Sequence, residues 1–140
     1  MSTVLWCNTL INNQLKSDES DKYYLYKHTK KLDKLCKALN LDLFSSAQDS
    51  SDMQVNLGVI DLPDIMQSTD ELMMDSGVWI EGAQAVEMIE KLVQAITDQN
   101  IRFGLVTNDS EEVLFELNES LNSAKDANLK RGMFNFSVVM

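Results

Sequence analysis

Proline, glycine, cysteine and histidine are scarce in this sequence of 140 residues, which holds one Pro, five Gly, two Cys and one His. Nucleotide-binding loops need several closely spaced glycines so that the backbone can approach phosphates. The five glycines here stand apart, which argues against a P-loop or a dinucleotide fingerprint. Two cysteines form at most one disulfide, so the sequence is not that of a small secreted scaffold held by several bridges.

Long apolar runs are also missing. No stretch approaches the roughly 18 apolar residues that a membrane-spanning helix needs. The first twelve residues lack a basic region followed by an apolar one, as a secretory signal would have. We therefore expect a cytoplasmic protein that makes no membrane contact.

Basic residues are few in the middle of the chain, and this is the strongest signal in the sequence. The net charge is -10 overall. Residues 41–124 hold seventeen Asp and Glu against Lys91 and Arg102 alone, whereas residues 1–40 carry +3 and residues 125–140 carry +2. Such a field repels nucleic acid phosphates and attracts basic proteins. We expect a basic protein partner and no nucleic acid, although acidity that serves only solubility is the simpler alternative.

Hydrophobic periodicity predicts alternating strands and helices. Residues 3–7 are β-prone and are followed by a turn at Asn12 and Asn13. Residues 21–39 carry apolar side chains on one helical face and lysines on the other. The other predicted elements are strands near residues 55–59, 77–80, 101–106 and 133–139, helices over residues 83–98 and 110–127, and two short helical turns after Asp61 and Ser68.

These elements indicate a single α+β domain over residues 1–140. We expect three main helices packed on a mostly antiparallel or mixed sheet of about four or five short strands. The scarcity of glycine-rich turns and of long buried apolar strands argues against a doubly wound parallel sheet.

The positions of histidine and cysteine in the sequence do not predict a metal or cofactor site. His28 lies on the apolar face of the first predicted helix, in the same stripe as Cys36, and Cys7 lies on the first strand. No CxxC or HxxxH spacing accompanies them, so we interpret the cysteines as buried apolar side chains and expect no metal, no cofactor and no catalytic residue. Nothing identifies a reaction, and the balance favours binding over catalysis.

The candidate contact surface lies between residues 61 and 75, where acids alternate with Leu, Ile and Met. An acidic rim around adaptable methionines suits a basic partner with an apolar centre. The alternative is that the apolar residues are the inner faces of two short helices. The predicted partner-binding residues are Asp61, Asp64, Asp70, Glu71, Met73, Met74 and Asp75.

The chain is thus predicted to be an acidic protein-interaction module, of the kind found among inhibitor or immunity proteins. One alternative is a small enzyme or ligand-binding domain that uses Asp109, Glu111 and Glu112 at a strand-to-helix turn, although these acids also suit helix capping. Another is a structural subunit that self-associates into a homo-oligomer through a lysine face of the first helix. That face comprises Lys27, Lys30, Lys31, Lys34 and Lys37.

Overall fold

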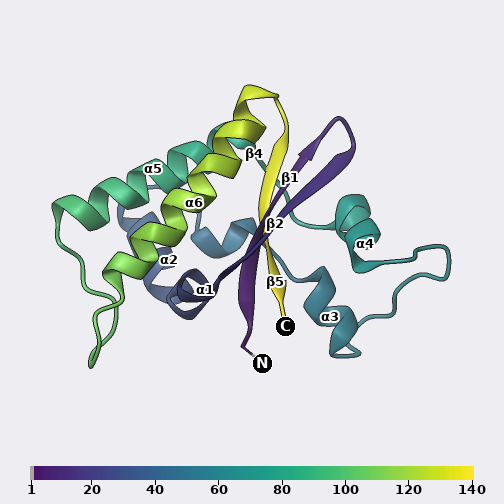
Figure 1. Cartoon of the computed structure of the whole chain (residues 1–140), viewed down its shortest axis with the longest axis horizontal. Coiled ribbons are helices and arrows are strands. Elements are labelled where there is room, and N and C mark those ends of the chain that lie inside the picture. The colour runs from purple at the N-terminus through teal and green to yellow at the C-terminus, as the bar shows by residue number, and fades with distance from the viewer. Residues whose placement is uncertain (1) are drawn as a thin grey trace.

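The computed structural model describes residues 2–140, which form six α-helices, one short 3-10 helix and five strands (Figure 1). In chain order the elements are β1 (Val4–Ile11), β2 (Gln14–Lys22), α1 (Tyr23–Lys27), α2 (Thr29–Ala38), η1 (Phe44–Ala47), β3 (Gln48–Asp49), α3 (Ser51–Asn56), α4 (Thr69–Ser76), β4 (Ile80–Glu81), α5 (Gly82–Asp98), α6 (Ser110–Leu129) and β5 (Met133–Val139).

The sheet has the order β2-β1-β5-β3, and β4 also pairs with β5. Every pairing is antiparallel except that of β3 with β5. The expected α+β class and mostly antiparallel sheet are therefore confirmed. The expectation of three main helices is wrong, because residues 2–140 contain six α-helices.

A hairpin joins β1 to β2 and extends the sheet beyond the single strand predicted here. Asn12 and Asn13 adopt φ of 52° and 62°, the left-handed pair that a two-residue hairpin turn requires. Ile11 then pairs with Gln14, and the register continues to Leu5 opposite Lys22 with one bulge. The predicted turn is confirmed, but β2 was not predicted.

The helix predicted over residues 21–39 is split at His28. This residue has φ -106° and ψ 21°, which ends α1 and starts α2. The apolar stripe is nevertheless confirmed, since Leu25, Leu32 and Cys36 are buried.

The strand predicted near residues 55–59 is wrong, because the chain forms α3 and then a helix-ending turn. Gly58 has φ 73° and donates its N–H to Val55 O at 3.0 Å, while Val59 donates to Gln54 O at 2.9 Å. These two bonds form a Schellman motif, in which a left-handed glycine satisfies the last carbonyls of a helix.

The strand predicted over residues 101–106 is also wrong, because this segment is a loop. The Arg102 guanidinium donates to the carbonyl oxygens of Gly104 at 2.8 Å and Leu105 at 3.2 Å, which folds the segment back on itself. Gly104 has φ 109°, which a side chain would disfavour.

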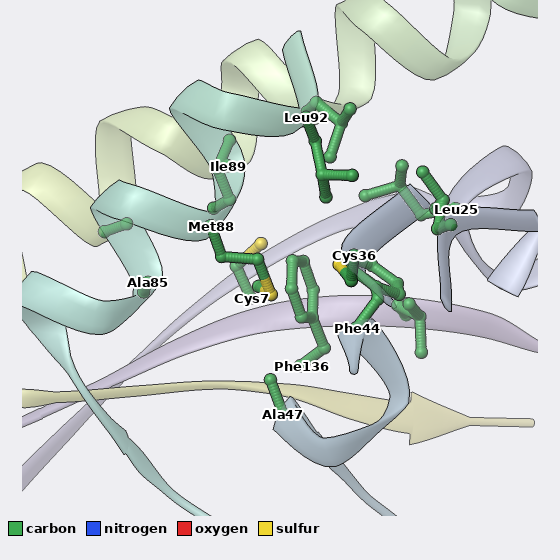
Figure 2. Packing of buried hydrophobic residues seen from close by; sticks show 14 of the residues in the cluster. Cys7, Leu25, Cys36, Phe44, Ala47, Ala85, Met88, Ile89, Leu92 and Phe136 are labelled. Atoms are coloured by element: carbon green, nitrogen blue, oxygen red, sulfur yellow. The ribbon is translucent and has the colours of Figure 1, made fainter. Parts of the chain in front are cut away.

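Alternation along the central strands separates the two faces of the sheet. Cys7 and Phe136 point toward the helical layer and pack with Phe44 in one buried cluster (Figure 2), to which Val138 also belongs. The Phe44 and Phe136 ring centroids lie 5.0 Å apart. α3 and α4 lie away from this helical layer, on the other side of the sheet (Figure 1). None of the helices within residues 2–140 has the length and apolarity needed to cross a membrane.

Candidate protein-binding surface

A short buried anchor holds α4 in place. Met73 is only 4% exposed, and its sulfur lies 3.9 Å from Asn8 Nδ2 on β1. Its carbonyl oxygen accepts the Trp79 indole N–H at 2.9 Å. Met73 therefore lies beneath the predicted contact surface and is removed from it, while Met74 is half-buried.

The start of α4 has the capping arrangement that the sequence predicts. Ser68 Oγ accepts the Glu71 N–H at 3.3 Å, and Glu71 Oε2 accepts the Gln67 N–H at 2.9 Å. The first bond satisfies an amide that the first helical turn leaves free, and the second ties the helix to Gln67, the residue before its N-cap. Glu71 is thus exposed but has a structural role as well.

Exposed aliphatic side chains gather where the chain runs from α3 to α4. Leu57, Val59, Ile60 and Ile65 are all exposed, with Ile65 at 90%. This connection projects from one end of the long axis of the molecule (Figure 1). Contiguous exposed apolar residues mark contact sites more often than isolated ones do. Within residues 61–75, Ile65 is the one exposed aliphatic side chain, whereas Leu62, Met66, Leu72 and Met74 are half-buried and Met73 is buried. The alternative that these side chains face inward therefore holds for all of them except Ile65.

The acids around these side chains are not neutralised. Asp61, Asp64, Asp70 and Asp75 are exposed, and none of them joins an ion pair within residues 2–140. Residues 38–90 contain no Lys, Arg or His at all. We use the name acidic apolar surface for Leu57, Val59, Ile60, Asp61, Asp64, Ile65, Asp70, Glu71, Met74 and Asp75.

A hollow of about 300 Å³ adjoins this surface, between the sheet and helices α3 and α4. Trp6 and Asn8 line it from β1, and Asp52 and Asp70 line it from the helices. The Trp6 indole N–H donates to Asp21 Oδ1 at 2.9 Å, which fixes the ring. An aromatic ring beside two carboxylates is a suitable environment for an ammonium or guanidinium group.

The alternative site at the start of α6 is arranged differently from the prediction. Asp109 Oδ2 lies 2.8 Å from His28 Nε2 and 2.9 Å from Lys27 Nζ. The Asp109 side chain makes no capping hydrogen bond, so its predicted capping role is wrong. Glu111 and Glu112 are exposed in the first helical turn. The sequence alone does not pair His28 with Asp109, because 81 residues separate them.

Asp109 stabilises the folded protein at neutral pH, and this contribution should be lost in acid. Hydrogen bonds from His28 and Lys27 lower the pKa of the Asp109 carboxyl below its ordinary 3.8. The unfolded chain then binds this proton at a higher pH than the folded chain does, so the stabilisation is complete above the ordinary value and is lost as the pH falls through the folded pKa. Thermal melts of wild type and Asp109→Asn should therefore differ at neutral pH, and the difference should shrink as the pH falls below 3.8. A difference in melting temperature that stays constant at every pH would show that protonation of Asp109 does not affect stability.

The two cysteines are free and buried. Burial raises the pKa of Cys7 to about 12 and that of Cys36 to about 11. The reactive thiolate form is therefore rare at neutral pH, which agrees with their interpretation as apolar side chains. Across residues 2–140, no group of three or more His, Cys, Asp or Glu side chains is placed to hold a metal ion.

Comparison with protein-family models, with curated proteins and with solved structures finds no match for this chain.

Proposed function

We propose that this chain is a cytoplasmic, non-catalytic protein-interaction module of the inhibitor or immunity type, which binds a basic partner through its acidic apolar surface. The observation that carries the proposal is the exposure of Leu57, Val59, Ile60 and Ile65 among acids without a basic neighbour in sequence. Burial of aliphatic area supplies affinity at the centre of such an interface. The surrounding carboxylates accelerate encounter and select a partner of opposite charge.

The hollow beside the surface adds a specific contact. A Lys or Arg side chain of the partner would enter between Trp6 and Asp70, with Asp52 behind them. Arg is enriched at the energetic centres of protein interfaces, where a buried planar cation fills a pocket. The partner is therefore expected to present an exposed Arg or Lys next to an apolar patch.

A capture experiment from native lysate tests the proposal with the wild-type chain beside a triple reversal, Asp61→Lys, Asp64→Lys and Asp75→Lys. These acids avoid the cap of α4, and a lysine at position 75 suits the helix C-terminus. The wild type should retain one dominant partner at low salt, less of it at moderate salt, and the triple reversal should lose it. Loss of binding should reach at least about a hundredfold if each reversal costs about 1 kcal/mol or more.

The matched control reverses three exposed acids elsewhere, Asp42→Lys, Glu90→Lys and Asp98→Lys. Both variants change the net charge from -10 to -4, because each replaces three negative charges with three positive ones. Retention of the partner by the control supports a local contact. Equal loss in both variants would reduce the effect to net charge and would contradict the proposal.

A further inference from the structure

A second charged surface lies on the outer side of α1 and α2. A hollow of about 400 Å³ is lined there by Lys27, His28, Lys30, Lys31, Lys34 and Leu35. No acidic side chain is among these lining residues. We call this the lysine hollow.

The lysines of the hollow differ in the contacts that their ammonium groups make. Lys27 is bound to Asp109, and the Lys31 ammonium donates to the Arg102 carbonyl while it lies 5.4 Å from the centre of the Phe103 ring. Lys30 and Lys34 are exposed and form no ion pair in the part of the chain that the structure describes. Two cations are therefore free to meet an acidic partner.

Two exposed aliphatic side chains stand beside the lysine hollow. Leu105 is 98% exposed and Val106 is 95% exposed, at the tip of the loop between α5 and α6. Arg102 holds the backbone of this tip, and Lys31 in turn holds Arg102. The loop is thus fixed next to α2 by hydrogen bonds and presents apolar area at the edge of a basic surface.

The lysine hollow and the exposed loop tip together resemble the acidic apolar surface with the opposite charge. The connection between α3 and α4 projects from one end of the long axis, and the loop between α5 and α6 projects from the other (Figure 1). One end exposes Ile65 among free carboxylates, and the other exposes Leu105 and Val106 beside free ammonium groups. The two ends of one molecule lie apart, so each can meet only the opposite end of another molecule.

We propose that the lysine hollow is the docking site for the acidic apolar surface of a second copy of this chain. In this contact Asp61 and Asp64 meet Lys30 and Lys34, and Ile65 meets Leu105. This inference rests on the surface named in the proposed function, so a second copy and the basic partner compete for it. The contact joins unlike surfaces and gives open head-to-tail chains unless a rotation closes a ring.

A second copy of the chain complements both the ammonium groups and the exposed aliphatic side chains of this site, whereas a polyanion complements only the ammonium groups. Nucleic acid phosphates would match the charge of the hollow but not the exposed aliphatic side chains of Leu105 and Val106. In the head-to-tail arrangement, the carboxylates of the acidic apolar surface meet the ammonium groups, and its aliphatic side chains meet those of the loop.

Two neutral variants test the arrangement by complementation. The first blocks the acidic end, with Asp61→Asn, Asp64→Asn and Ile65→Ser, and the second blocks the basic end, with Lys30→Gln, Lys34→Gln and Leu105→Ser. Sedimentation velocity at moderate salt should show that the mean mass of wild type rises with concentration. Each variant alone should remain a monomer, and their mixture should reach twice the monomer mass and grow no further.

The control removes two exposed cations and an exposed aliphatic residue far from the hollow, with Lys125→Gln, Leu129→Ser and Arg131→Gln. It should associate as the wild type does. Monomeric wild type at every concentration, or a mixture that does not pair, overturns the inference. So does co-sedimentation of monomers with phosphatidylserine vesicles that is lost in the second variant, because the lysine hollow would then face a membrane. In each case the capture experiment from native lysate, repeated with the second variant, tests the proposed function separately, because this variant keeps the acidic apolar surface.

Discussion

Replacement of Phe136 by alanine is expected to lower the free energy of unfolding by about 3–5 kcal/mol, the usual cost of emptying a buried phenylalanine site. Phe136 is completely buried on the central strand β5, and its ring lies 5.0 Å from the rings of both Phe44 and Phe134. Figure 2 shows it between β5 and the side chains from α5. Since folded domains are stable by about 5–15 kcal/mol, this one change removes a large share. Urea unfolding followed by circular dichroism measures it.

Phe115→Ala is the matched control, because it deletes the same atoms from a side chain that is 65% exposed on α6. Its effect should stay within about 0.5 kcal/mol, as for other surface substitutions. Similar losses for the two phenylalanines would mean that the cluster around Phe136 is not the core of the fold.

Gly82→Ala is expected to destabilise the protein by about 3 kcal/mol or more, at the upper end of the cost of overpacking. Gly82 is the first residue of α5 and lies against the end of α6. A Cβ atom there would lie 2.7 Å from the carbonyl carbon of Ala127 and would also collide with the Asn128 amide nitrogen. Backbone atoms cannot turn aside as a flexible side chain can, so the two helices would have to separate.

The sign of this change is informative, because alanine normally favours a helix over glycine by up to about 1 kcal/mol. Chemical denaturation should therefore show a loss where helix propensity alone predicts a gain. Gly58→Ala provides the comparison, since no atom lies within 4 Å of its added Cβ and only its φ of 73° opposes the substitution, at about 1–2 kcal/mol. A stabilised Gly82→Ala protein would show that α5 and α6 do not approach closely at this point.

The fold could be predicted where local pattern and tertiary environment agree. The helices α5 and α6 and the strand β5 have long periodic apolar faces that become buried, and all three were predicted. β2 could not be predicted by hydrophobic alternation, because it is a polar edge strand with one buried residue, Lys22. Its conformation comes from pairing with β1. The predicted turn at Asn12 and Asn13 was the available sign of β2, but we interpreted it as the end of β1 and not as a hairpin turn.

The two strands predicted wrongly have a common cause. Alternating apolar residues near 55–59 and 101–106 satisfy the strand pattern, yet Leu57, Val59, Leu105 and Val106 are exposed. A period-2 pattern predicts a strand on the assumption that one face is buried. Here Leu57, Val59, Leu105 and Val106 stay at the surface although Phe103 is buried, and Gly58 and Gly104 take positive φ angles that interrupt an extended strand.

Of the residues in the acidic apolar surface, the sequence predicted the exposed acids but not the exposed aliphatic side chains of the connection between α3 and α4. Asp61, Asp64, Asp70 and Asp75 are exposed as an acidic rim requires, whereas Met73 turned out to be an anchor under α4. A helical periodicity cannot tell which Met of an adjacent pair faces inward when the helix is only eight residues long. The remaining apolar contacts lie in the connection, where no periodicity applies.

Some acids elsewhere in the chain have structural partners. Glu116 Oε1 accepts the Leu25 N–H at 3.0 Å, and burial raises the pKa of this carboxyl. Asp109 binds His28 and Lys27. Asp61, Asp64 and Asp75 differ from these two acids, since each is exposed and has no ion-pair partner in the described residues. Their charge is available to a second molecule.

Site-specific photo-crosslinking in native lysate tests the central claim most directly. A photoreactive phenylalanine analogue is placed at position 65 in one chain and at position 115 in another, because Ile65 and Phe115 are both exposed but lie in different regions. We expect position 65 to crosslink one partner other than the chain itself, with a yield that is weakened by salt and absent in the triple reversal, and position 115 to give no such product. The same partner captured equally from both positions, or from position 115 alone, would contradict the assignment of the acidic apolar surface as the binding site.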